Sequence, residues 1–139
     1  MAGVSSQGLT ISIGNGASPE TFTDIANITG HDGPSRENPE IDVTSLSSTA
    51  KEFLPGLVDN GEISINLNFD ASDNSHDALL DAQEARTVHN FKITWPGSAS
   101  PPKAWTFPAF VKSFSTSSSV DAPLTGSLTL RITGAVTRP

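Results

Sequence analysis

The sequence predicts an all-β protein with two packed antiparallel sheets, sandwich- or barrel-like, and one flanking α-helix. Three observations support this fold class. Apolar residues alternate with polar ones over short runs, turn-forming residues separate those runs, and one segment has helical spacing. The 139 residues suffice for one hydrophobic core and not for two, so we expect a single domain, 1–139.

The two clearest strands are predicted at 61–69 and 125–133. In both, every second residue is apolar and the intervening residues are polar, which indicates one buried and one solvated face. The apolar residues are Ile63, Ile65, Leu67 and Phe69 in the first run and Leu128, Leu130 and Ile132 in the second.

Weaker alternation predicts further strands at 8–13, 21–29, 40–44, 88–95 and 104–120. In the last of these, the alternation places Phe110 and Phe114 on one face, opposite three serines. Turn signals rich in Gly, Asn, Asp and Pro lie at 14–16, 31–34, 59–61 and 95–97. Short strands separated in this way favour a sandwich or barrel.

One helix is predicted over residues 75–86. Asp73 or Ser75 can cap its start, and Asp77 suits its first turn. An apolar stripe follows, made of Leu79, Leu80 and Ala82. A single helix of this kind normally covers one face of a sheet.

Residues 31–40 and 45–60 fit neither pattern. The second segment is longer than most connections in a compact domain, and it carries Phe53, Leu54 and Leu57, which a solvated loop would not favour. We interpret 45–60 as an arm that packs on another subunit. The alternative is that it folds back onto its own core.

No residue pattern indicates catalysis, a cofactor or a metal site. The sequence has no cysteine, which excludes disulfides, thiol catalysis and cysteine-ligated metals. His31, His76 and His89 lack metal-ligand spacing, so we expect surface or capping roles for them. Residues 70–76 resemble a calcium loop, but Ser75 stands where such a loop requires glycine. A strand-to-helix turn is the better interpretation, and we expect no enzyme.

The charge distribution argues against tight nucleic-acid binding. The formal net charge is −7, and the eight basic residues are scattered along the sequence. Neither a signal peptide nor an apolar run of bilayer length is apparent. We therefore expect a soluble protein made in the cytosol, with no membrane anchor.

Two tryptophans leave a second function class open. Trp95 and Trp105 flank a Pro- and Ser-rich stretch, 96–102, as they would at the ends of paired strands. They can form a sugar-stacking platform, in which case the protein is a carbohydrate-binding β-sandwich. Cross-strand packing of the two indoles is the commoner arrangement.

Several segments in order resemble the lambda-like tail tube proteins of siphophages. The segments are Gly16–Ile25, Ile41–Leu46, Ala50–Leu57, Gly61–Ile63 and Leu128–Gly134. They match the family's opening segment, its "D-V-T", "K-x-F-x-P-G" and "G-x-(V/I)" patterns, and its closing strand. The resemblance covers nearly the whole chain. Some members carry an additional C-terminal immunoglobulin-like domain, which we do not expect here because the sequence stops at Pro139.

The resemblance implies six-subunit rings that stack into a hollow tube for genome delivery. One sheet of each subunit would join its neighbours in a continuous inner barrel through which DNA passes without specific binding. It implies residence in the virion tail, synthesis in the cytoplasm of the bacterial host, and a tape measure protein, a tail terminator and tail-tip proteins as partners. A type VI secretion tube or a baseplate component, which share the fold, is the related alternative.

Two sets of residues are the candidates for assembly. In the 45–60 segment, the resemblance implies contacts to adjacent subunits or the next ring, with candidates Leu46, Lys51, Glu52, Phe53, Leu54, Pro55 and Leu57. For the lumen we expect the polar faces of the strands, with candidates Glu62, Ser64, Asn66, Asn68, Ser115, Ser117, Thr129 and Arg131. Arg131 would place a positive charge in the bore unless Glu62 or another acidic residue pairs with it.

Overall fold

The computed structural model describes residues 7–16, 20–97 and 102–138. Residues 17–19 of the Gly16–Ile25 segment and 98–101 of the stretch between the tryptophans lie outside the described residues. The elements are β1 (Thr10–Gly14), β2 (Phe22–Asp24), β3 (Ile28–Asp32), β4 (Glu40–Asp42), β5 (Phe53–Pro55), β6 (Glu62–Asn68), α1 (Asn74–Ala85), β7 (His89–Thr94), β8 (Ala104–Ser117) and β9 (Thr125–Ile132).

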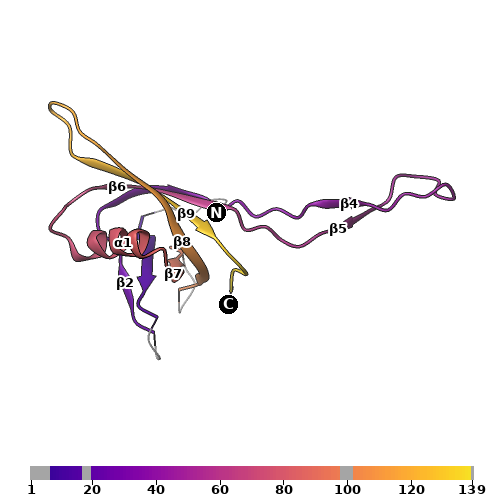
Figure 1. Cartoon of the computed structure of the whole chain (residues 1–139), viewed down its shortest axis with the longest axis horizontal. Helices are drawn as coiled ribbons and strands as arrows, with labels where there is room; N and C mark the ends of the chain where they lie inside the picture. The colour runs from indigo at the N-terminus through magenta and orange to yellow at the C-terminus, as the bar shows by residue number, and fades with distance from the viewer. Residues whose placement is uncertain (1–6, 17–19, 98–101, 139) are drawn as a thin grey trace.

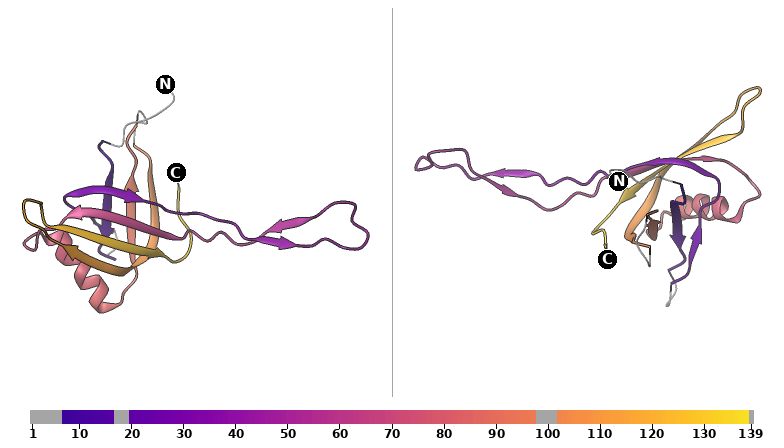
Figure 2. Two further views of the ribbon diagram at one scale, coloured as in Figure 1. Left: turned by 90° about the horizontal axis from the view of Figure 1, so that it is seen from above. Right: turned by 180° about the vertical axis from the view of Figure 1, so that it is seen from behind.

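The body of the protein is one antiparallel sheet that folds into two layers. Its strand order is β2-β1-β7-β8-β9-β6-β3. The long strand β8 pairs with β7 through residues 104–109 and with β9 through residues 109–117. The sheet therefore turns a corner near Ala109, and the strands of the two layers cross in Figure 2 (left). The all-β class with one helix is confirmed, and the two packed sheets are the two halves of this continuous sheet.

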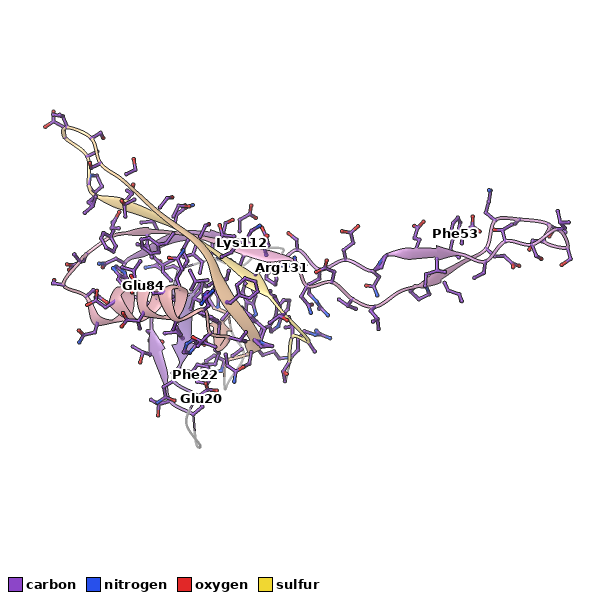
Figure 3. All side chains as sticks on the ribbon, viewed as in Figure 1. Glu20, Phe22, Phe53, Glu84, Lys112 and Arg131 are labelled. Atoms are coloured by element: carbon purple, nitrogen blue, oxygen red, sulfur yellow. The ribbon has the colours of Figure 1, made fainter. Side chains whose placement is uncertain are left out.

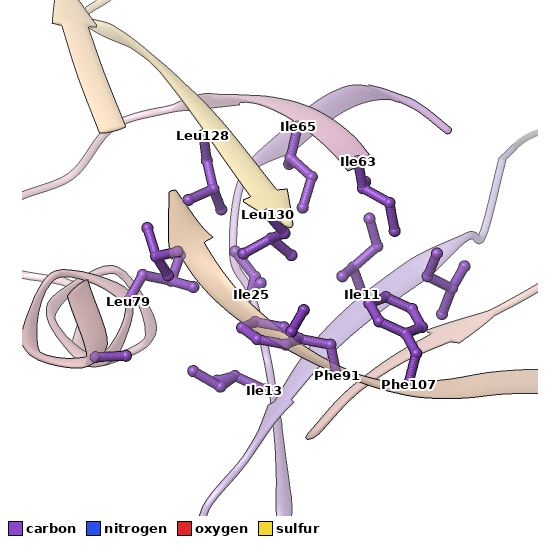
Figure 4. Packing of buried hydrophobic residues seen from close by; sticks show 14 of the residues in the cluster. Ile11, Ile13, Ile25, Ile63, Ile65, Leu79, Phe91, Phe107, Leu128 and Leu130 are labelled. Carbon is purple, nitrogen blue, oxygen red and sulfur yellow. The ribbon is translucent and has the colours of Figure 1, made fainter. Parts of the chain in front are cut away.

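The core lies between the two layers (Figure 4). The alternation predicted for the two clearest strands is confirmed, because the apolar residues of β6 and β9 lie in this core. They are Ile63, Ile65, Leu67, Leu128, Leu130 and Ile132, none more than 4% exposed. The opposite layer contributes Ile11, Phe91 and Phe107. Burial of these side chains is the main favourable term in folding such a domain.

Helix α1 closes the open side of the core beside β8 (Figure 1). Of the two predicted caps, Asp73 is the N-cap, and its carboxylate accepts from the backbone N–H groups of Ser75 and His76. The helix ends at Arg86, whose φ of 56° is left-handed. Leu79 and Ala82 point into the core. No helix in the described part of the chain is long and apolar enough to cross a membrane.

The expectation of a surface or capping role is wrong for His76, which is fully buried. Its Nε2 donates to the carbonyl of Ala26 at 2.7 Å, and its Nδ1 accepts from the backbone N–H of Asp70 at 3.1 Å. The ring also stacks on Phe69, with centroids 5.7 Å apart. A polar ring is tolerated there because both nitrogens have partners.

The prediction of one strand over residues 21–29 is wrong, because the chain forms two short strands, β2 and β3, in this region. β2 pairs with β1 at the edge of one layer, and β3 pairs with β6 at the edge of the other. Between them Ile25 enters the core and Asn27 adopts a left-handed φ of 64°. The segment therefore crosses from the edge of one layer to the edge of the other, and the left-handed turn at Asn27 interrupts the strand.

The shared face predicted for Phe110 and Phe114 is also wrong. A β-bulge between Val111 and Ser113 shifts the alternation by one residue. Phe110 consequently lies opposite Arg131 on the outer face, whereas Phe114 lies opposite Leu128 and packs on the core.

Candidate assembly surfaces

The outer face of the β8-β9-β6-β3 layer is polar. Cross-strand neighbours such as Ser115, Ser127 and Asn66 form rows of short uncharged side chains across it. By the same register, this one face carries all the residues predicted for the lumen, which are Glu62, Ser64, Asn66, Asn68, Ser115, Ser117, Thr129 and Arg131. Their apolar neighbours in sequence point into the core, as expected for strands with two different faces.

Two charged residues lie at one end of this polar face. Glu62 and Arg131 are opposite each other in the register, but each pairs elsewhere. Glu62 binds Lys112, and Arg131 binds Asp59 at 3.3 Å. The backbone N–H of Gly61 and the charge of Arg131 hold the pKa of Asp59 below its usual value. Arg131 therefore has the acidic partner that the sequence interpretation required.

Both edges of this layer lack a pairing strand within the described chain. β3 pairs only with β6, and residues 110–117 of β8 pair only with β9. An unpaired strand edge presents backbone donors and acceptors that another chain can satisfy.

The second prominent surface is the arm, residues 33–61, a β-hairpin that projects from the body as a long extension (Figures 1 and 2). The segment 45–60 forms its tip and its returning strand, so folding back onto the core is excluded. Backbone pairing runs along its length, between β4 and β5 and again between Glu37 and Asp59 at 2.9 and 2.8 Å. The strand β5, which the sequence did not predict, is one half of this ladder.

The root of the arm is anchored to the body. Asn60 is buried and its amide donates to the carbonyl of Gly134 at 2.7 Å. Its side-chain oxygen accepts from Arg36 Nε at 3.1 Å, and the Arg36 guanidinium lies over the ring of Trp105 at 5.8 Å. This anchor of Arg36, Asn60 and Trp105 was not predicted from the sequence. The only pattern that pointed to it was the turn predicted at 59–61. These contacts tie the first and last residues of the arm to the body.

Most side chains of the arm are exposed to solvent. Figure 3 shows Phe53 far out on the arm, well away from Lys112 and Arg131 in the body. All the arm residues predicted as contacts are exposed, namely Leu46, Lys51, Glu52, Phe53, Leu54, Pro55 and Leu57. Phe53 and Leu54 are 50% and 54% exposed, and Leu57 is 91% exposed. So many exposed apolar residues on one segment indicate a protein-binding surface.

The two tryptophans pack on one another. Their rings meet edge to face, 5.1 Å between centroids and 76° between planes, as cross-strand packing predicts. His31, placed in a turn by the sequence interpretation, lies in β3 with its ring 5.8 Å from Trp95. A sugar-stacking platform needs open ring faces, and Arg36 covers Trp105. Among the described residues, no three His, Asp or Glu side chains gather as metal ligands.

The comparison with protein-family models identifies one family. The model for lambda-like phage tail tube proteins matches residues 2–138. No curated protein matches the sequence significantly. The fold is similar to that of a chain in the tail of an empty gene transfer agent particle, refined with C6 symmetry, with a TM-score of 0.78, 20% identity and 99% of both chains covered.

Two further solved structures share the fold. One is the SPP1 tail tube, with a TM-score of 0.76, 14% identity, and coverage of 98% of this chain and 78% of that one. The other belongs to the sheath–tube complex of an extracellular contractile injection system, with a TM-score of 0.73, 11% identity, and coverage of 99% and 92%. Because the family model spans nearly the whole sequence, this chain belongs to the lambda-like phage tail tube family.

Proposed function

We propose that this chain is the ring-forming subunit of a phage tail tube, with six copies per ring and rings stacked into a hollow conduit for DNA. One observation carries the proposal. The β8-β9-β6-β3 layer combines a face of mostly uncharged polar residues with an unpaired strand at each edge. A layer of this kind can join its neighbours edge to edge around a bore.

Ring closure would satisfy the open edges. β3 of one copy would lie beside the 110–117 segment of β8 in the next, so each copy uses two different edges and the ring closes. The polar face would then line the bore. Hydroxyl and amide groups offer DNA only weak contacts, and a chain of net charge −7 repels phosphate. DNA would therefore pass without binding specifically.

The arm would supply the contacts between copies or between rings. Its anchored root reduces the ordering cost of association, since the hairpin already points away from the body. A tape measure protein, a tail terminator and tail-tip proteins would be the other partners. The protein would reside in the virion tail after synthesis in the host cytoplasm and would have no catalytic role.

Electron microscopy of the purified protein over a concentration series tests this proposal. Rings or hollow tubes that appear with rising concentration would support it. Monomers at every concentration, together with sugar binding that depends on Trp95 and Trp105, would favour the carbohydrate-binding alternative.

The lining of the bore needs its own test, for which the absence of cysteine is convenient. A single Ser127→Cys variant should react with a bulky polyethylene-glycol maleimide as a monomer and be protected in tubes. A small maleimide should react in both states, because it can enter the bore. Protection from both reagents would place Ser127 in an interface instead, and reaction with both in long tubes would place it outside.

A further inference from the structure

One face of the arm combines negative charge with an aromatic ring. In the β4–β5 register, Asp42 lies opposite Phe53 and Glu40 lies opposite Pro55. These residues share a face, because directly opposed residues of antiparallel strands point to the same side. The backbone N–H and hydroxyl of Thr44 hold the pKa of Asp42 below its usual value, so its carboxylate is charged at neutral pH.

A groove on the body has the complementary character. It lies between the end of α1 and β8 and has a volume of about 470 Å³. Two cations, Arg86 and Lys112, line it together with the exposed apolar side chains of Val88 and Phe110. A cation beside apolar side chains suits a partner that presents a carboxylate beside an apolar ring.

One of the two charges of this groove, that of Arg86, has no ion pair among the described residues. The described residues form two ion pairs, Lys112 with Glu62 and Arg131 with Asp59, and neither involves Arg86. The larger groove at the arm root is less suitable. Its arginines, Arg36 and Arg131, already bind Asn60 and Asp59, and Asp59 itself lines that groove.

If an arm fills this groove, that arm must come from a different copy of the chain. The arm runs away from α1 in every view, so it cannot reach the groove of its own chain (Figures 1 and 2). The groove also lies beside the unpaired 110–117 edge of β8, and β4 follows β3, the other unpaired edge. Ring closure through these edges would bring the leading strand of one arm toward the groove of the next copy.

We propose that the groove formed by Arg86, Val88, Phe110 and Lys112 receives the arm of a second copy, through the arm face that carries Glu40, Asp42 and Phe53. This inference rests on the proposed tube function and names the receptor for the arm. A carboxylate of the arm would lie against the Arg86 guanidinium, and the Phe53 ring would cover the apolar part of the groove.

Charge reversal tests this pairing. Arg86→Glu should raise the protein concentration needed for assembly at least tenfold, and adding Glu40→Lys to the same chain should restore most of that loss. Lys103→Glu makes the same charge change on an exposed part of the body outside the groove, so it should assemble as the wild type does. The folded state of each variant is checked by circular dichroism.

Cross-linking tests the contact directly. A mixture of Glu40→Cys and Arg86→Cys chains should form disulfide-linked heterodimers under mild oxidation. A mixture of Glu40→Cys and Asp77→Cys, which is exposed near the start of the same helix, should not. Equal cross-linking at both sites, or assembly of Arg86→Glu at wild-type concentration, would overturn the groove assignment and leave the tube function intact. Wild-type protein that stays monomeric at every concentration would count against both.

Discussion

Replacement of Phe53 and Leu54 by serine should abolish or strongly weaken assembly and leave the monomer folded. The two side chains are 50% and 54% exposed in the isolated chain, so about half of each remains to be buried by a partner. Complete burial of such a side chain contributes about 1.5–3 kcal/mol, which leaves about 1 kcal/mol for each residue. The pair therefore contributes about 2 kcal/mol per contact, or roughly a 30-fold change in the association constant.

Light scattering over a concentration series measures the onset of assembly, and urea denaturation of the monomer measures its stability. The onset should shift about 30-fold, with little change in the urea midpoint, because neither side chain lies in the core of the body. A double variant that keeps the side chains apolar, Phe53→Leu with Leu54→Ile, is the matched control and should assemble near the wild-type concentration. The reasoning is refuted if the serine variant assembles normally, or if it unfolds at a markedly lower urea concentration.

Three further predictions concern the body. Leu130→Ala should lower the free energy of unfolding by about 2–5 kcal/mol, because Leu130 is fully buried. Thr129→Ala, on the opposite face of the strand, should change it by less than about 0.5 kcal/mol. Equal urea midpoints for the two variants would contradict this prediction. Asn60→Ala should lower the free energy of unfolding by about 1–3 kcal/mol, since Arg36 and the Gly134 carbonyl lose their hydrogen-bond partner. An unchanged urea midpoint would show that the anchor is dispensable. The hydroxyl and N–H of Ser75 hold the pKa of Asp73 in the folded state below its usual value of 3.8. As the pH falls, the unfolded chain therefore takes up the proton first, and the stability that the charged carboxylate contributes is lost between the unfolded-state pKa and the lower folded-state pKa. Asp73→Asn, which still caps α1, should flatten the acid limb of the stability profile, and identical profiles would contradict this.

Local sequence patterns were sufficient where a feature depends on neighbours along one segment. The period-two runs at 61–69 and 125–133 predicted which residues of β6 and β9 enter the core, since alternation alone assigns the faces of a strand. The pattern narrowed the N-cap of α1 to Asp73 or Ser75, and Asp73 is the residue that caps it. The exposed apolar run around Phe53 predicted a surface made for a partner.

Other features depend on which segments pair, and no local pattern encodes this. The bulge between Val111 and Ser113 places Phe110 and Phe114 on opposite faces, and it arises from the pairing of β8 with β9. His76 reads as a surface residue in sequence, yet it is buried because Ala26, 50 residues away, supplies a carbonyl to its ring.

The sequence by itself determined the all-β class, the core faces of the main strands, the helix and the apolar segment that became the arm. Only the tertiary structure decided where the sheet bends, how the arm is anchored and which edges remain unpaired. The anchor joins Arg36 to Asn60 and Asn60 to Gly134, pairs that lie 24 and 74 residues apart. Such contacts form only when the chain closes long loops, so side-chain alternation and capping, which act over a few residues, carry no information about them.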